Sequence, residues 1–267
     1  MTHFALSAAF ATSLLLAAAG AHAAPPAGQD AFAIGQVKVD VGGRKLNMYC
    51  AGKGSPTVVF EADGGRAGWD WSAVMPEVAK RTRACVYDRA GYGFSDPAIR
   101  ASTAGNASRD LSFLLKNARM MEGPYVMVGA GYGAMIAQQF ALRSRGAVTG
   151  LVLVEAMHED ALPGDRAASL EAAAACIDSA GQGAACAYPN TAINGEIGPA
   201  LAAAQAAQVA KPAYWRARAS ELDNLAASAN QMRTARKPFG DMPVVEVAHG
   251  EPSAIIAAVM QVLDKQK

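Results

Sequence analysis

The sequence predicts an α/β fold with a mostly parallel central sheet and an inserted helical segment. Four short apolar runs, at residues 57–61, 83–87, 125–128 and 151–155, lack the alternation of half-exposed strands, so they indicate strands buried on both faces. Helix-like segments separate these runs, which is the order of parallel strands joined by crossover helices. Ala-rich sequence without a credible strand then covers residues 159–236.

The elements around these runs follow from local patterns. Residues 36–40 and 45–50 flank Gly42-Gly43 and predict an antiparallel hairpin with one exposed face. The crossover helices are expected at residues 71–80, 108–118 and 134–145, with Ser108 as an N-cap. After the helical insertion, residues 243–247 predict one more strand. A final helix over 252–264 has Pro252 in its first turn.

Residues 1–23 have the features of a signal peptide. They contain no Lys, Arg, Asp or Glu, they carry an apolar run, and they end in Ala21-His22-Ala23, which fits the small-x-small cleavage pattern. An uncleaved tail or a membrane anchor is the alternative, but the run is short for a spanning helix. We therefore expect a secreted or periplasmic protein with no membrane span after cleavage.

The composition narrows the range of partners. With 52% hydrophobic and 18% charged residues the chain is a typical globular protein, and a net charge of +1 offers no basic field for a phosphate backbone. We expect no nucleic-acid partner, no cofactor and no metal site, because the cysteine spacings form no CxxC pair. A small molecule remains the expected ligand.

The segment Gly129-Ala130-Gly131-Tyr132-Gly133-Ala134 lies between a predicted strand and a predicted helix, and it has two interpretations. The first is a dinucleotide fingerprint, G-x-G-x-x-A, with Glu155 at the distance of a ribose-binding acid. At least three strands precede the motif, whereas the fingerprint usually opens its own unit. The second interpretation is a nucleophile elbow, G-x-S-x-G, whose flanking positions are Gly129 and Gly133.

The sequence around this segment favours the elbow. The stretches "SPTVVFEADGG", "WDWSAVMPEVAKRTRACVYDRAGYGFSDP", "GPYVMVGAGYGA" and "GLVLVEAMHED" resemble the esterase- and lipase-like branch of the α/β-hydrolase fold family. "YWRARASELDNLAASANQMRTARKPFGDMP" is similar to that branch's lid. After the expected signal peptide at 1–23, the resemblance implies a core at 24–158 and 237–267 and a helical lid at 159–236.

The resemblance also exposes a departure, because the family's serine falls on Gly131. Glycine has no side chain that could attack a carbonyl. The two backbone N–H groups that form the family's oxyanion hole match Gly64 and Tyr132, and a backbone path can keep them without catalysis. We therefore expect a degenerate serine-hydrolase homologue, a pseudoenzyme, that binds a small apolar or carbonyl ligand.

The remaining catalytic positions are poorly filled. His249 and Glu155 are the candidates for a displaced base and its acid, while Glu251 and His158 have ordinary surface interpretations. "FGDMPVVEVAHG" resembles the family's seventh strand more than its eighth, which would leave no loop for the catalytic histidine. An active hydrolase of ester-like substrates would need an unconventional group, such as water activated by His249, or Ser95. A dinucleotide-binding protein is the second alternative.

The four cysteines are expected to pair in an oxidising compartment. A flexible turn separates Cys176 from Cys186 and favours a local bridge, although two buried free thiols would also fit. The strand order of the resembled family places Cys50 opposite Cys85, which implies a second disulfide.

Overall fold

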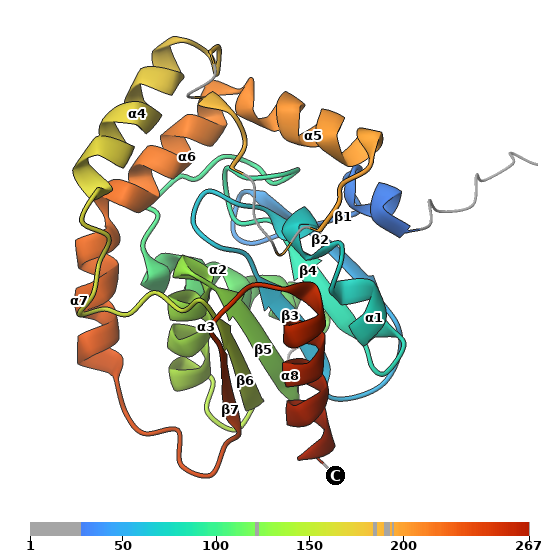
Figure 1. Cartoon of the computed structure of the whole chain (residues 1–267). Helices are drawn as coiled ribbons and strands as arrows, with labels where there is room; N and C mark the ends of the chain where they lie inside the picture. Colours follow the sequence, from blue (N-terminus) through green and yellow to red (C-terminus); the bar gives the residue numbers. More distant parts are fainter. Residues whose placement is uncertain (1–27, 121–122, 184–185, 190–192, 194, 267) are drawn as a thin grey trace, which may run out of the picture.

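The computed structural model describes residues 28–266 except 121–122, 184–185, 190–192 and 194. The expected signal peptide at 1–23 lies outside the described residues. Seven strands form one sheet in the order β1-β2-β4-β3-β5-β6-β7 (Figure 1). The strands are β1 (Val37–Asp40), β2 (Lys45–Ala51), β3 (Thr57–Glu61), β4 (Ala84–Tyr87), β5 (Tyr125–Ala130), β6 (Val148–Val154) and β7 (Val244–Val247).

The sheet is mixed, as predicted. The pairs β1–β2 and β2–β4 are antiparallel, and every later pair is parallel. Strand β7 pairs with β6 at the outer edge, so residues 244–247 take the seventh place, and no described residue forms a strand beyond it. This agrees with the resemblance of that segment to a seventh strand.

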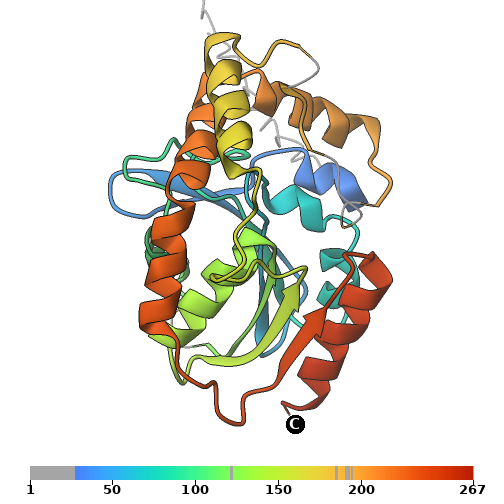
Figure 2. The same ribbon diagram turned by 60° about the vertical axis from the view of Figure 1, so that its left-hand side comes forward.

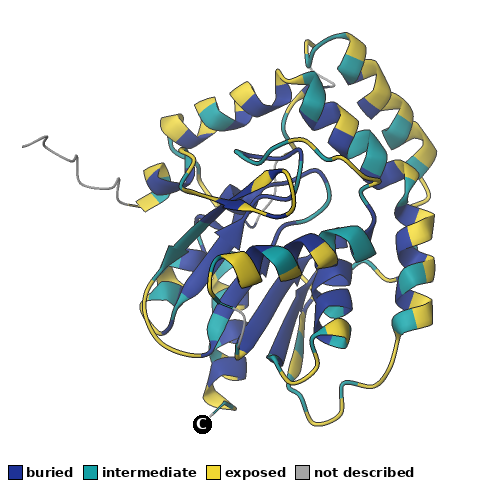
Figure 3. Ribbon diagram, turned by 180° about the vertical axis from the view of Figure 1, so that it is seen from behind, coloured by how far each residue is buried: buried dark blue, intermediate teal, exposed yellow. Residues whose placement is uncertain are grey.

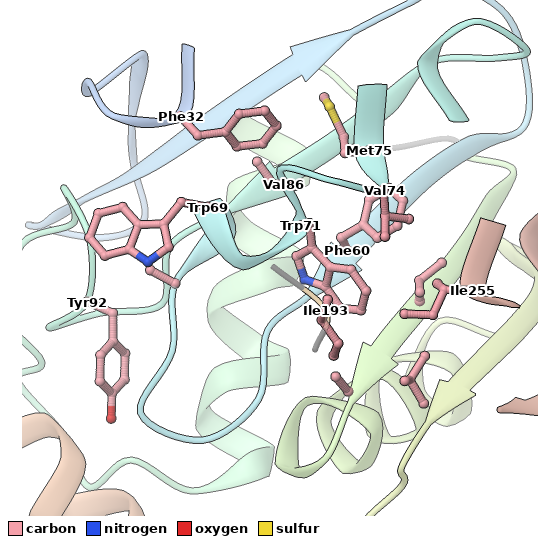
Figure 4. Close-up of a cluster of buried hydrophobic side chains, with 14 of the residues drawn as sticks. Phe32, Phe60, Trp69, Trp71, Val74, Met75, Val86, Tyr92, Ile193 and Ile255 are labelled. Atoms are coloured by element: carbon pink, nitrogen blue, oxygen red, sulfur yellow. The ribbon is translucent and has the colours of Figure 1, made fainter. Parts of the chain in front are cut away.

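Helices cover both faces of the sheet. Helices α2 (Ala104–Asn117) and α3 (Tyr132–Arg143) pack on one face, while α1 (Met75–Ala79) and α8 (Pro252–Asp264) pack on the other. Alternate strand residues supply the two cores, as period-two side chains must. In Figure 4, Phe60 of β3 lies next to Trp71, which is fully buried, and Ile255 of α8 belongs to the same cluster.

All three predicted crossover helices differ from the observed ones in their bounds, and α3 begins and ends two residues before the predicted 134–145. The segment predicted at 71–80 divides into a 3-10 helix, η2 (Gly68–Trp71), and the short helix α1. Helix α2 begins four residues earlier than expected because Thr103, rather than Ser108, is its N-cap and accepts from Asn106 N at 3.2 Å. Ser108 is buried inside the helix instead.

The helical insertion joins β6 to β7. It contains α4 (Arg166–Asp178), α5 (Pro199–Val209), α6 (Pro212–Asp223) and α7 (Leu225–Ala235). Helices α4, α5 and α6 lie above the sheet and α7 runs down beside α3, as two views agree (Figures 1 and 2). Their outer surfaces are exposed whereas the central strands β3 to β6 are buried (Figure 3). No helix among the described residues is long and apolar enough to cross a membrane.

Both expected disulfides are present. Cys50 and Cys85 are directly opposed across the antiparallel β2–β4 pair and are bonded to each other. Cys176, at the end of α4, is bonded to Cys186. The first disulfide therefore links the N-terminal hairpin covalently to strand β4, and the second closes a loop within the insertion.

Candidate functional site

The turn from β5 into α3 has the shape of a nucleophile elbow. Gly131 stands alone between the two elements with φ +51° and ψ −118°, a backbone conformation that strains any residue with a Cβ. The flanks are equally tight. A Cβ on Gly129 would lie 2.6 Å from the carbonyl oxygen of Gly133, and one on Gly133 would lie 2.3 Å from that of Ala62. The close packing of β5, α3 and the end of β3 thus requires this glycine pattern.

The side chain of Asp63 fills the space beside Gly131. A Cβ built on Gly131 would lie 2.0 Å from Asp63 Oδ1 and 2.3 Å from its Cγ, far inside any real contact. Asp63 belongs to the loop that follows β3, and its side chain is 36% exposed. A residue larger than glycine at position 131 and the observed Asp63 conformation therefore exclude each other.

The same carboxylate binds the two backbone donors that were expected to form an oxyanion hole. Gly64 N donates to Asp63 Oδ1 at 2.6 Å, and Tyr132 N donates to the same oxygen at 2.7 Å. The second oxygen, Oδ2, lies 3.9 Å from Arg66 Nε. The structure thus brings Gly64, Gly131 and Tyr132 together, but around a carboxylate that belongs to the protein.

A buried charge network supports this loop from below. Arg89 Nη1 donates to Glu61 Oε1 at 2.7 Å, and its Nε donates to Glu221 Oε1 at 3.0 Å. The guanidinium also donates to the carbonyl oxygens of Ala62 and Asp63, at 2.6 and 2.8 Å. One side chain therefore holds the backbone on which Asp63 is mounted.

Burial dominates the electrostatics of this network. It raises the pKa of Glu61, although the nearby guanidinium of Arg89 opposes that shift. Burial alone would lower the pKa of Arg89, but the carboxylates of Glu221 and Glu61 raise it well above its ordinary value. Arg89 accordingly stays charged at any working pH.

Helix α6 of the insertion docks directly on the glycines after Asp63. Glu221 Oε2 accepts from Gly65 N at 2.8 Å, and Tyr214 donates from its hydroxyl to the carbonyl oxygen of Gly65 at 2.9 Å. The Arg218 side chain lies so close that a Cβ on Gly64 would be 2.8 Å from its Nη1. The two glycines let the helix approach the loop.

A cavity of about 240 Å³ lies between this loop and the insertion. We call it the elbow cavity. Asp63, Gly64 and Tyr132 line it from the core, and Met157 and Pro163 line it from the chain that leaves β6. Helices α4 and α6 and the start of α7 add charged and apolar side chains, namely Arg166, Ser169, Arg218, Glu221, Leu222 and Leu225. The site therefore offers a mixed, partly apolar chamber above the elbow.

The alpha/beta hydrolase family model matches residues 58–263. The chain belongs to this family. Among curated relatives, it is 33% identical over 104 residues to the protein YqjL of Bacillus subtilis, which covers 39% of this chain and 41% of YqjL. It is 31% identical over 114 residues to a 2-hydroxymuconate semialdehyde hydrolase of a Pseudomonas species, which covers 42% of this chain and 40% of that enzyme.

Other relatives show the fold alone or match a smaller part. A vacuolar membrane protein of Saccharomyces cerevisiae is 29% identical over 113 residues, 41% of this chain and 18% of that protein, so the chain spans less than half the length of these curated relatives. Cfl2 of Burkholderia cenocepacia superimposes with a TM-score of 0.65 at 16% identity, over 86% of this chain and 93% of Cfl2. The epoxide hydrolase CorEH gives 0.60 at 13%, over 86% and 99%.

The two candidates for a displaced base and its acid, His249 and Glu155, lie away from the elbow cavity. His249, in the loop after β7, is exposed and is not among the described residues that line the cavity. Glu155, at the end of β6, is also exposed and accepts from Gly250 N at 2.8 Å, so it fixes the loop after β7. The structure therefore does not bring His249 and Glu155 to Gly131.

The other polar candidates have structural partners. Ser95 Oγ accepts from Asn47 N at 2.8 Å and donates to the carbonyl oxygen of Asp88 at 2.6 Å. Glu251 is at the N-cap position of α8 but makes no side-chain cap. His158, Glu159 and Asp160 have ligand atoms close enough for a metal ion, yet both carboxylates pair with arginines of α7 and its end, Arg233 and Arg236.

Sequence reasoning missed Asp63 and Glu221. The signal for Asp63 was its place directly before Gly64 in the motif "EADGG". Nothing in the sequence indicates that its side chain turns back onto the donors of its own loop, because that depends on the empty space left at Gly131.

Proposed function

We propose that this protein is an exported member of the alpha/beta hydrolase family that binds a small molecule in the elbow cavity and does not cleave esters through a serine. One observation carries the proposal: the Asp63 carboxylate occupies the place of a side chain at Gly131 and accepts from both Gly64 N and Tyr132 N. Covalent ester hydrolysis needs a nucleophile together with free donors for the oxyanion. Both needs are unmet at this elbow.

The position of Asp63 changes the kind of ligand that we expect from a carbonyl compound to a hydrogen-bond donor. A ligand carbonyl would have to displace Asp63 before it could accept from the two N–H groups. A ligand that itself donates a hydrogen bond can instead meet Asp63 Oδ2, which neither N–H group binds. Met157, Leu222 and Leu225 supply apolar surface for the rest of the molecule. We therefore propose an apolar ligand with a hydroxyl or amine group.

A fluorophosphonate probe tests the absence of a serine pathway. We expect no adduct in the intact mass of the full-length protein and no hydrolysis of p-nitrophenyl acetate above the rate in buffer, while a serine esterase treated in parallel is labelled completely. The matched variant is Asp63→Ala with Gly131→Ser, which returns a hydroxyl to the elbow and frees the donors. Labelling of the unmodified protein at any serine would overturn the proposal.

A second candidate is an active hydrolase in which Asp63 is the reacting carboxylate. It is favoured by the position of this carboxylate, which lies where an elbow side chain would be. Oδ2 would attack an electrophilic carbon of an epoxide ring, the ring C–O bond would break, and the alkoxide would take a proton from water. The product would be an ester on Asp63. A mass increase equal to one epoxide, absent in Asp63→Asn, would support this candidate, and an unchanged mass would exclude it.

We also propose export and cleavage after Ala23, with residues 159–236 as a lid. Two disulfides support an oxidising compartment. The mass of the protein recovered from the periplasm or medium tests this: a mature chain beginning at Ala24 is expected, and an uncleaved cytoplasmic chain would contradict it. The dinucleotide alternative is disfavoured because Tyr132 N, at the start of α3, faces a carboxylate that would repel a pyrophosphate.

A further inference from the structure

A second cavity lies beside the elbow cavity and has a different character. Its accessible space is about 30 Å³, whereas one water molecule needs roughly 10–15 Å³ on the same measure. The wall is formed by β2, β4, the loop after β4 and the first turns of α2, with Tyr132 and Glu221 shared with the elbow cavity. It is thus large enough for a group of a few heavy atoms, and we call it the arginine cavity.

Arg44 lines this cavity, and two of its buried donor atoms have no acceptor among the described residues. Gly42 and Gly43, at φ +100° and +84°, form the turn between β1 and β2, and the next residue, Arg44, is turned inward with its side chain only 4% exposed. Its Nη2 bonds to Asp110, but no described residue accepts from its Nε or Nη1. A guanidinium has five N–H donors, and burying some of them unbonded is unfavourable, so an acceptor is expected in the adjoining space.

One positive charge at the rim of the cavity favours an anion over a neutral acceptor. Three arginines line the cavity, and the carboxylates of Asp110, Glu221 and Glu61 pair with two of them, Arg44 and Arg89. Arg89 is occupied by Glu61, Glu221 and two backbone carbonyls. Arg100 is exposed at the rim and pairs with no carboxylate among the described residues. An anion can therefore reach Arg44 past a cationic rim.

Much of the rest of the wall is apolar. Its small and branched aliphatic side chains are Leu46, Ala90, Ala98, Ala101 and Ala107, and the residues Tyr87, Ser102 and Asn106 add polar groups. Arginine matches the carboxylate geometry, and methyl-lined walls suit a short hydrocarbon chain. We propose that the arginine cavity binds the carboxylate of a short aliphatic acid, with Arg44 as its principal donor. This site is separate from the proposed ligand of the elbow cavity and does not depend on it.

Ligand-observed NMR on the full-length protein tests the proposal. The probes are acetate, propionate and butyrate in chloride-free buffer, followed through the relaxation of their methyl protons. We expect saturable binding at millimolar concentrations, as is usual for ligands of so few heavy atoms. Chloride forms a separate arm: if chloride binds and the three acids do not, the carboxylate assignment is overturned in favour of a monatomic anion.

Variants locate the site. Arg44→Met combined with Asp110→Asn removes both partners of the buried pair and should abolish binding. Arg44→Lys, which keeps a charge opposite Asp110 but loses the planar donors, provides the test if the double variant fails to fold, and should weaken binding about tenfold or more. The matched control is Arg109→Ala, an exposed arginine of α2 stacked on Phe113, which should leave binding unchanged.

The elbow cavity is tested separately with Asp63→Asn. Retained acetate binding in this variant, together with its loss in the Arg44 variants, supports the proposal. Binding that is unaffected by the Arg44 variants, binding lost in Asp63→Asn, or the absence of any saturable signal would each overturn it. None of these outcomes depends on whether the elbow cavity takes its own ligand.

Discussion

The turn after β5 and the loop after β7 both follow the carboxyl ends of parallel strands, but they differ in how well they match a hydrolase site. At the turn, a Cβ on Gly129 or Gly133 would lie less than 3 Å from backbone atoms, and the side chain of Asp63 fills the place of a side chain at Gly131. At the loop, His249 is exposed, and Glu155 bonds to the backbone rather than to an imidazole. The backbone shape of the elbow is thus fixed by the packing of the sheet, whereas His249 and Glu155 are not brought to Gly131.

The largest expected effect is at Arg89, which supports the elbow side of this comparison. Arg89→Met leaves Glu61 buried without a counter-charge and Glu221 with only Arg218, 3.9 Å away. We therefore expect a loss of about 3–5 kcal/mol in the free energy of unfolding, measured in urea. The control is Arg81→Met, whose partner Asp264 is 62% exposed, with an expected loss of less than about 1 kcal/mol. Equal losses in the two variants would contradict the account.

The pH dependence of the free energy of unfolding tests a second buried acid near the elbow, Asp70. Asp70 bonds to Arg66 at 3.0 Å and to the Tyr188 hydroxyl at 3.1 Å, and burial raises its pKa from 3.8 to about 6 despite these partners. The native state therefore binds more protons than the unfolded state between these values. The contribution of Asp70 to the free energy of unfolding is fully present below about pH 4 and is lost as the pH rises through 6.

Comparison with Asp70→Asn isolates this contribution, because the other carboxyl groups are common to both proteins. The difference in unfolding free energy, wild type minus variant, should fall by at most about 3 kcal/mol between pH 4 and pH 7. The fall should be complete soon after pH 6. A difference that rises with pH would show that the ionised Asp70–Arg66 pair outweighs the burial of Asp70.

Gly131→Ser tests whether Asp63 and an elbow side chain exclude each other. We expect a loss of about 1–3 kcal/mol from backbone strain and further loss from contact with Asp63. In an Asp63→Ala background this contact is absent. A double-mutant cycle of Gly131→Ser and Asp63→Ala should therefore show a coupling free energy of about 0.5–3 kcal/mol.

Gly146→Ala is the matched control for that cycle. Gly146 has φ +91°, and a Cβ there meets nothing within 4 Å, so it suffers strain without a contact. Its coupling to Asp63→Ala should be zero within error. A coupling free energy as large as that of Gly131→Ser would show that the coupling does not come from contact between position 131 and Asp63.

The smallest effect is expected at the loop after β7. His249→Ala removes an exposed side chain outside the elbow cavity, so the unfolding free energy should change by less than about 0.5 kcal/mol, and any background ester hydrolysis should be unchanged. Turnover that is abolished by this substitution would show that His249 acts on the elbow after all.

Much of the fold was accessible from the sequence because it rests on local patterns. The buried apolar runs mark β3 to β6. The glycines mark the elbow because backbone contacts exclude a Cβ at 129 and 133, while a positive φ disfavours one at 131. The start of α2 was missed because two hydroxyl residues compete for the N-cap position, and only tertiary packing shows that Ser108 is buried.

The side chains that form the site were harder to predict from the sequence, because their positions depend on contacts between distant segments. Arg89 and Glu221 are 132 residues apart, and no periodicity connects them. Asp63 is adjacent to Gly64, but its role follows from the rotamer that brings Oδ1 within 2.7 Å of Tyr132 N. The inward turn of Arg44 likewise follows from the hairpin packing on α2 and not from composition.

Amide hydrogen exchange at Gly64 and Tyr132 tests the central claim most directly, because these two N–H groups are assigned to Asp63 Oδ1. NMR spectra of the full-length protein and of Asp63→Ala would give both exchange rates. We predict that both amides are protected in the wild type and that both exchange faster in the variant, while other amides of β5 and α3 keep their protection. Unchanged rates at both positions would contradict the claim that Asp63 occupies the oxyanion site.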